Sequence, residues 1–204
     1  GAGKSTLSRR TAKELGFIYV DTGALYRAVG LKFSKLGFDT ELNCNIEDIL
    51  KDTIVDIRFV DGEQRVFLDG DDVSDSIRTP NASMMASAVS AKPPVRAFLL
   101  EMQRKLAREN DVLMDGRDIG TVVLPNAGLK IFLTATPEDR ANRRYLELLG
   151  RGIETTYEEV LRDIQIRDKN DSSRAAAPLR PADDAVYMDT TGVKFEQRCE
   201  LIFG

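Results

Sequence analysis

The first six residues, GAGKST, constrain this chain more than any other stretch. Gly3, Lys4 and Ser5 fill the last three positions of the pattern G-x-x-x-x-G-K-[ST], a loop that closes around phosphate groups. Glycines lack a Cβ, so backbone N–H groups can approach phosphate oxygens closely. Lys4 is expected to reach the β- and γ-phosphates, and the Ser5 hydroxyl a Mg²⁺ ion. The predicted phosphate-binding residues are Gly1, Ala2, Gly3, Lys4, Ser5 and Thr6.

A helix is predicted directly after this loop. KSTLSRRTAKELG (4–16) has apolar residues at helical spacing and ends at a glycine. The positive end of its dipole would point at the bound anion. The first glycine of the pattern would lie three residues before Gly1, so we expect the strand that feeds the loop to lie outside this chain. The alternative is a glycine-rich turn that caps an ordinary helix.

Strands and helices then alternate in the manner of a parallel α/β sheet. FIYV (17–20) indicates a strand, and residues 22–36 indicate a helix with Thr22 as its expected cap. Three more strands and three further helical stretches are predicted. The strands are VLMD (112–115), LKIFLTA (129–135) and AVYMDTTG (185–192); the helical stretches are KPPVRAFLLEMQRKLAREN (92–110), an Arg-rich segment broken near Gly150, and FEQRCELIF (195–203).

An antiparallel insert interrupts this alternation. IVDIRFV and RVFLDG alternate in polarity and are joined by DGEQ, which is a hairpin signal. We expect the insert to span roughly residues 38–90. The predicted fold class is therefore α/β: a P-loop parallel sheet flanked by helices, with a small antiparallel insert.

Composition excludes several classes of protein. The net charge of −4 argues against bulk binding of nucleic acid, and no apolar run reaches the ~18 residues of a membrane span. Histidine is absent, which removes the usual general base and the usual zinc motifs. The two cysteines, Cys44 and Cys199, fit a reducing cytoplasm better than a disulfide framework.

An acid and a set of arginines are the remaining chemical groups of interest. Asp115 ends an apolar strand and could orient Mg²⁺ directly or through water, although Asp-Gly is also a common turn. Several phosphates brought together require bidentate cations, for which arginine is suited. Nine arginines lie in or beside motifs: Arg27, Arg78, Arg96, Arg117, Arg143, Arg144, Arg151, Arg167 and Arg174. A GTPase is disfavoured because KND (169–171) has the wrong order for guanine recognition.

Five stretches together resemble the bacterial cytidylate kinases, over nearly the whole chain. They are GAGKST, DTGALYR (21–27), DGRDIGTVV (115–123), KIFLTA (130–135) and RDKNDSSRAAAPL (167–179). The resemblance implies transfer of the ATP γ-phosphate to CMP or dCMP, with Mg²⁺. It implies a five-stranded parallel sheet, a nucleoside-monophosphate-binding (NMP-binding) insert at 38–90, and a core of 1–37 and 91–204. A mobile helical lid is implied at about 138–178.

The resemblance also implies roles for individual residues. The cytosine-reading group is Thr22, Arg96 and Asp118. The group at the CMP phosphate is Arg27, Arg117 and Arg174, with Arg78 on the same face, and the group at the ribose is Arg167 and Asp171. Arg143 and Arg144 lie where lid arginines approach ATP, Ser5 and Asp115 are the metal candidates, and Lys4, Arg117 and Arg174 are the catalytic candidates. In this family a serine can stand in place of Thr22, which keeps the hydroxyl.

Two other functions remain open from the sequence. One is another P-loop nucleoside monophosphate or small-molecule kinase, which a substrate panel would separate. The other is a non-catalytic nucleotide-binding module, in which the arginines only solvate the surface. For any of the kinases we expect a cytoplasmic monomer that binds ATP and its acceptor, without a membrane and without bulk nucleic acid.

Overall fold

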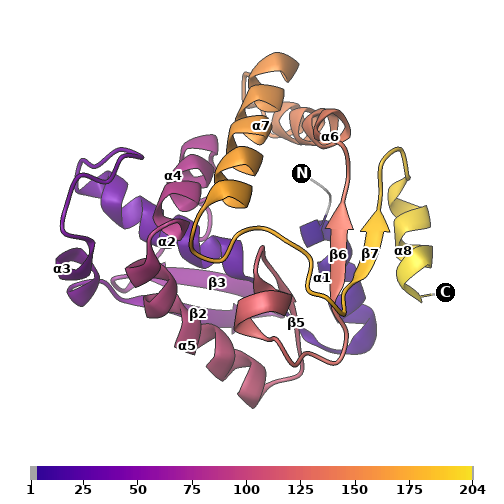
Figure 1. Cartoon of the computed structure of the whole chain (residues 1–204), viewed down its shortest axis with the longest axis horizontal. Coiled ribbons are helices and arrows are strands. Elements are labelled where there is room, and N and C mark those ends of the chain that lie inside the picture. Colours follow the sequence, from indigo (N-terminus) through magenta and orange to yellow (C-terminus); the bar gives the residue numbers. More distant parts are fainter. Residues whose placement is uncertain (1–3, 204) are drawn as a thin grey trace. The chain divides into compact units, whose positions relative to one another are not determined.

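The computed structural model describes residues 4–203. These residues divide into two compact units (Figure 1). The first unit contains the chain up to Gly16, Arg117–Ser173 and the chain from Pro178 onward; the second contains Phe17–Gly116 and Arg174–Ala177. None of the helices within residues 4–203 is both long and apolar enough to span a membrane.

The second unit combines a parallel strand pair with an antiparallel sheet. β1 (Ile18–Asp21) pairs in parallel with β5 (Val112–Asp115), so that Asp21 lies opposite Asp115. The antiparallel sheet has the order β2-β3-β4. Its strands are β2 (Val55–Val60), β3 (Glu63–Leu68) and β4 (Asp71–Asp72). The unit's helices are α2 (Thr22–Lys35), α3 (Ile46–Lys51), α4 (Pro80–Ser90) and α5 (Pro93–Glu109).

The predicted hairpin is confirmed, with a two-residue turn. Asp61 and Gly62 both have positive φ, 52° and 77°. A turn of this kind matches the right-handed twist of the flanking strands, and Asp-Gly is a favoured sequence for it. Glu63 and Gln64 of the predicted DGEQ signal belong to β3 rather than to the turn.

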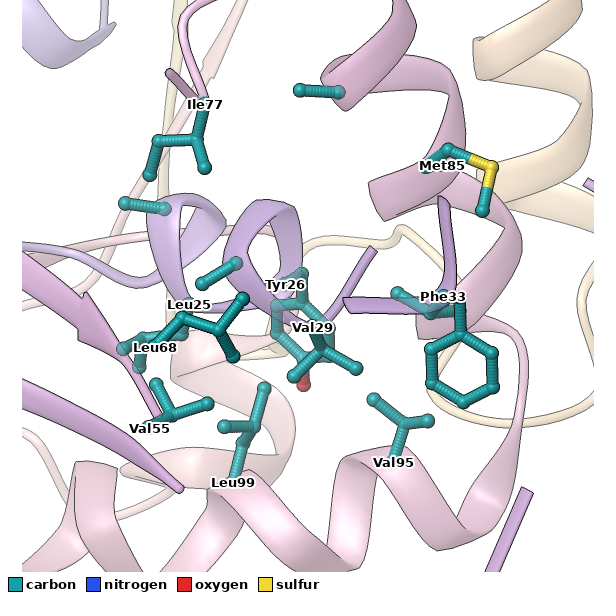
Figure 2. Packing of buried hydrophobic residues seen from close by; sticks show 14 of the residues in the cluster. Leu25, Tyr26, Val29, Phe33, Val55, Leu68, Ile77, Met85, Val95 and Leu99 are labelled. Atoms are coloured by element: carbon teal, nitrogen blue, oxygen red, sulfur yellow. The ribbon is translucent and has the colours of Figure 1, made fainter. Parts of the chain in front are cut away.

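Helix α2 is the centre of the second unit's core. Figure 2 shows its Leu25 beside Leu68 of β3, and its Val29 above Leu99 of α5. On another side α2 packs closely on α4, because Gly30 has no side chain: a Cβ there would lie 2.9 Å from the Cβ of Met85. The sequence analysis missed α4 and α3, although Thr79-Pro80 is a helix-start signal and the Thr79 side chain accepts from Ala82 N.

The first unit contains the second parallel pair and the helices of the Arg-rich segment. β6 (Ile131–Thr134) pairs in parallel with β7 (Val186–Asp189), as Figure 1 shows. Its helical elements are α1 (Lys4–Leu15), the π-helical turn η1 (Ile119–Val123), α6 (Pro137–Gly150), α7 (Tyr157–Ser173) and α8 (Phe195–Phe203). α6 and α7 bury Ala141, Leu148, Val160 and Ile164 between them.

The fold class predicted from the sequence is confirmed: parallel strands are flanked by helices, and a separate antiparallel sheet is present. Among residues 4–203 the parallel strands form two pairs, not one five-stranded sheet. The predicted break in the Arg-rich segment is also confirmed, since α6 ends at Gly150 and Gly152 has a φ of 70°.

Candidate functional site

In the second unit, Asp21 organises the junction between β1 and α2. Its carboxylate accepts from Ala24 N and so caps α2, while its other oxygen forms an ion pair of 2.7 Å with Arg27. The cap expected at Thr22 is therefore wrong by one residue, because Asp21 is the last residue with extended backbone. Arg27, predicted to bind phosphate, lies one helical turn into α2 and is oriented by this pair.

Thr22 has a different role from the predicted cap. It is only 2% exposed, and its hydroxyl donates to the carbonyl oxygen of Asp115 at 2.9 Å. The carboxylate of Asp115 in turn accepts from the Tyr19 hydroxyl at 3.2 Å. Asp115 is 8% exposed, so the predicted metal-orienting acid is a buried residue, held at its carboxylate by Tyr19 of β1 and at its main-chain carbonyl by Thr22 of α2. The role of Tyr19 was not predicted from the sequence, because the residue pattern of its strand does not indicate which distant residue it contacts.

Two predicted substrate arginines meet at a serine in the same unit. Arg96 donates to the carbonyl oxygen of Ser90 at 2.9 Å, and Arg174 donates to the Ser90 hydroxyl at 3.0 Å. Ser90 is buried, and its hydroxyl donates to the carbonyl of Ser87, which fixes its orientation. The Arg96 guanidinium also lies over the Tyr26 ring, 5.4 Å from its centroid. The sequence analysis missed Ser90, which is the last residue of a helix that it did not predict.

The surroundings of Arg78 differ from those of Arg27, Arg96 and Arg174. It follows β4 and is exposed, and its backbone N–H donates to the carbonyl of Asp75. The structure therefore brings Arg96 and Arg174 together at Ser90 in this unit, whereas Arg78 lies on an exposed segment between β4 and α4.

In the first unit, an ion pair joins a predicted phosphate ligand to a predicted ribose ligand. Arg117 Nε lies 2.7 Å from Asp171 Oδ2, and Asp171 is 1% exposed. The Asp171 carbonyl also accepts from Leu179 N, which anchors the chain after α7. Arg167 lies one turn earlier on α7 and is half-buried. A buried carboxylate requires such a partner, so this pair fixes the direction of the Arg117 guanidinium.

Asp118 begins the π-helical turn that follows. Its side chain is 5% exposed, and its carbonyl accepts from Val122 N at 2.9 Å. Gly120 lets the turn approach Lys130, the residue before β6: a Cβ there would lie 3.2 Å from Cδ of Lys130. Lys130 itself forms an ion pair of 2.7 Å with Asp184. Wide turns of this kind are frequent at functional sites. The π-helical geometry of this turn was not predicted from the sequence.

The arginines of α6 are held by partners within the first unit. Arg143 donates to the Thr190 carbonyl and pairs with Asp139, while Arg144 pairs with Glu147 at 2.6 Å. Arg140, one turn before Arg144, forms a two-point pair with Asp168 of α7. Beside Arg143, burial lowers the pKa of Arg198, and the neighbouring Arg143 charge lowers it further.

Only part of the predicted phosphate loop lies within the described residues. Gly1, Ala2 and Gly3 lie outside them, whereas Lys4, Ser5 and Thr6 form the first turn of α1. The predicted helix is confirmed, and Gly16 follows it with a φ of 71°. The Ser5 hydroxyl and the Asp115 carboxylate are both hard oxygen ligands of the kind that Mg²⁺ prefers. No group of three histidine, cysteine or acidic residues within 4–203 could hold a metal ion by itself.

Comparison with known proteins settles the family. A sequence model of the family "Cytidylate kinase" matches residues 1–204. The chain belongs to the cytidylate kinase family. It is 53% identical to the cytidylate kinase of Caldicellulosiruptor bescii, over 97% of this chain and 87% of that protein. It is 50% identical to that of Caldicellulosiruptor saccharolyticus, with the same coverage, and 48% identical to that of Caldanaerobacter subterraneus, over 100% and 89%. The resemblance seen in the sequence motifs is thus confirmed.

Proposed function

We infer that this protein transfers the γ-phosphate of ATP to CMP or dCMP, giving ADP and CDP or dCDP. The observation that carries this conclusion is the family match over residues 1–204, with about 50% identity to several cytidylate kinases over nearly all of the chain. Phosphoryl transfer to a phosphate needs no general base, because the acceptor oxygen is already ionised at neutral pH. The absence of histidine is therefore compatible with this chemistry.

For the ATP side, we propose that Gly1, Ala2, Gly3, Lys4, Ser5 and Thr6 hold the phosphates, with Arg143 and Arg144. The positive end of α1 favours an anion at its first turn, where Lys4 and Ser5 lie. Bound Mg²⁺ would supply neutralising charge on the phosphate oxygens, and Ser5 and Asp115 would be its protein ligands, directly or through water. Mg²⁺ commonly needs only one or two protein ligands when a nucleotide supplies the others.

For the acceptor phosphate and ribose, we propose the remaining arginines and their partners. Arg27, Arg117 and Arg174 would hold the CMP phosphate, and Arg117 and Arg174 would also stabilise charge on the group in transfer. Each of the three is oriented by a polar contact: Arg27 to Asp21, Arg117 to Asp171, and Arg174 to Ser90. Oriented guanidinium groups suit planar, bidentate recognition of phosphate. Arg167 and Asp171 would contact the ribose hydroxyls, and Arg78 would lie nearby.

For the base, we propose Asp118, Thr22 and Arg96. Cytosine has an amino donor at N4 where uracil has a carbonyl acceptor. The Thr22 hydroxyl already donates its hydrogen bond to the carbonyl of Asp115, so it can only accept a hydrogen bond from a ligand. That state matches the N4 donor and opposes uracil O4. A carboxylate at Asp118 is also acceptor-only when ionised, so both residues would favour cytosine for the same reason.

We further propose that residues 38–90 act as the NMP-binding insert and that about 138–178 act as a lid. The lid would contain α6 and α7, whose arginines would approach ATP. Residues 1–37 and 91–204 would form the core of the kinase. We also propose that the protein works as a cytoplasmic monomer. Its cysteines are free thiols in the described chain, which suits a reducing compartment.

A coupled assay for ADP release tests the proposed function. The full-length protein, with ATP and Mg²⁺, should release ADP rapidly with CMP or dCMP and much more slowly with UMP, AMP, shikimate or no acceptor. Faster release with another acceptor would assign a different kinase. ATP binding without CMP-dependent release would assign a non-catalytic module and overturn the proposal.

Base recognition is tested separately by Asp118→Asn. An amide can rotate to present either a donor or an acceptor, so the kcat/KM ratio of CMP to UMP should fall by about tenfold or more. Asp183→Asn makes the same charge change at an exposed residue of the same unit and should leave the ratio unchanged. An unchanged ratio in Asp118→Asn would show that Asp118 does not read the base.

A further inference from the structure

We propose that Gln64 is a positioning residue for the acceptor nucleotide: it fixes Asp21, and through Asp21 it orients Arg27. The side-chain amide of Gln64 accepts from Asp21 N at 2.9 Å and donates to Asp21 O at 3.1 Å. Gln64 and Asp21 are 43 positions apart in the sequence. The inference rests on the proposed function, because it takes Arg27 as a ligand of the CMP phosphate.

Among residues 4–203, β1 has a paired strand on one side only, which explains why an amide is needed on the other side. Ile18 donates its N–H to Asp111, so residues 18 and 20 direct their peptide groups at β5. In a parallel strand, alternate residues direct their N–H and C=O groups to opposite sides. The N–H and the C=O of Asp21 therefore both face away from β5. Gln64 satisfies this N–H and this C=O together, as a peptide group of a neighbouring strand would. Without Gln64, two backbone groups at a part-buried position would lose their partner.

The register of the hairpin delivers Gln64 to this edge. Gln64 lies opposite Phe59 in the β2–β3 ladder, one pair beyond the turn at Asp61 and Gly62. A slip of one residue would turn Gln64 to the other face of the sheet. The insert is therefore attached to the end of β1 by a contact that depends on its own register, and this contact is specific rather than a general apolar packing.

From the backbone of Asp21 the effect reaches Arg27 through one carboxylate. The Asp21 side chain holds Ala24 N with one oxygen and Arg27 with the other. The space for this arrangement is narrow, because a Cβ at Gly23 would lie 3.1 Å from Asp21 Oδ1 and 3.2 Å from Arg27 Nη1. Gly23 lies inside α2 and its φ is not positive, so it is the neighbouring pair that requires a glycine there. A shift of the Asp21 backbone would therefore misplace the guanidinium of Arg27.

The consequence is a kinetic signature on the acceptor side. Loss of binding that is equal in the ground and transition states raises KM and leaves kcat unchanged. In the full-length protein, Gln64→Met keeps the length of the side chain and removes both hydrogen bonds. We expect the KM for CMP to rise about tenfold, with kcat within threefold and the KM for ATP within twofold. Gln64→Glu keeps only the acceptor and faces a carbonyl with a carboxylate, so its KM for CMP should rise at least as much.

A control on the same hairpin separates positioning from general damage to the insert. Arg58 lies on β2 with its guanidinium 4.1 Å from the Phe67 ring centroid, away from Asp21. Arg58→Gln should leave both KM values within twofold. A KM for CMP within twofold of wild type in Gln64→Met would overturn the positioning role. Absence of CMP-dependent ADP release in the wild-type protein would instead overturn the proposed function.

A measurement on the wild-type protein keeps the inference testable if the variants fail to fold. The backbone amide of Asp21 should be protected from hydrogen exchange, because Gln64 accepts its N–H. NMR exchange rates should place it with the amides of β1 that donate to β5, such as Ile18. Exchange as fast as in an unstructured peptide would overturn the contact on which the proposal stands.

Discussion

The two parallel strand pairs end in similar sequences, Asp-Thr-Gly after β1 and Asp-Thr-Thr-Gly after β7. In each, the threonine after the aspartate is buried and donates its hydroxyl to the last carbonyl of the neighbouring strand. Thr22 donates to Asp115 at 2.9 Å, and Thr190 donates to Thr134 at 2.9 Å. The same local sequence thus closes both strand pairs in the same way.

Apart from that threonine, the two strand ends differ in their contacts. Asp21 caps a helix that begins at once and forms the ion pair with Arg27. Asp189 is exposed and accepts from the N–H and the hydroxyl of Thr191, which folds the extra residue into a turn. An acid at a strand end is therefore not a mark of a phosphate site by itself. The immediate start of a helix, which brings Arg27 one turn above Asp21, makes the difference.

The largest expected difference is between the two acids. Asp21→Ala removes the ion pair and the cap and should lower kcat/KM for CMP about a hundredfold, while Asp189→Ala should lower it less than fivefold. Steady-state kinetics with CMP varied and ATP saturating measure both. Comparable losses in the two variants would show that the two strand ends do not differ in function.

Substitution of the two buried threonines should have similar effects on the stability of the protein but different effects on its specificity for CMP. Thr22→Val and Thr190→Val each remove a hydroxyl donor to a strand-end carbonyl, which should lower the free energy of unfolding by about 1 kcal/mol. The Thr134 carbonyl keeps the backbone N–H of Thr190 as a donor, so Thr190→Val should cost no more than Thr22→Val. Urea denaturation measures this loss. Only Thr22→Val should also narrow the kcat/KM ratio of CMP to UMP. If Thr190→Val narrows that ratio to the same extent, the comparison fails.

Replacement by alanine should act mainly on stability at Gly192 and mainly on CMP kinetics at Gly23. Gly192 has a φ of 69°, so Gly192→Ala should lower the free energy of unfolding by about 1 kcal/mol. At Gly23 the backbone is helical, and Gly23→Ala should cost less stability but raise the KM for CMP severalfold by displacing the Asp21–Arg27 pair. Thermal unfolding and CMP kinetics on both variants decide between these two reasons for a glycine.

The smallest effect concerns the exposed acid. The N–H and hydroxyl of Thr191 hold the pKa of Asp189 below its ordinary value of 3.8. A carboxyl whose pKa is lowered by folding stabilises the folded state above pH 3.8, and this contribution disappears as pH falls through the folded pKa. Thr191→Val should therefore raise the Asp189 pKa towards the ordinary value in an NMR titration. An unchanged midpoint would mean that the hydrogen bond from the Thr191 hydroxyl is not maintained in solution.

The sequence was sufficient for elements with a local signal. The period of α1, the Asp61-Gly62 turn and the break at Gly150 are each encoded within a few residues, so the structure confirms them. The motif stretches were likewise sufficient for the family. Helix α4 was missed because its small residues give little contrast between faces, even though Thr79 and Pro80 mark its start.

Contacts between distant residues were beyond sequence reasoning. Tyr19, Gln64 and Arg174 lie 43 to 96 positions from the residues that they contact, which are Asp115, Asp21 and Ser90 respectively. Nothing in the local pattern around Tyr19 or Gln64 distinguishes them from other residues of a strand. Their placement follows from register and pairing, which the structure supplies.

Ser90 has a consequence for how the molecule is prepared for an anion. A free arginine side chain samples many rotamers, and restricting it costs about 2 kcal/mol of conformational entropy. Because one serine of the protein itself holds both Arg96 and Arg174, most of that ordering accompanies folding and not ligand capture. The incoming nucleotide would then meet two guanidinium groups of restricted mobility, and its association should carry a smaller entropic penalty than a flexible pair would impose.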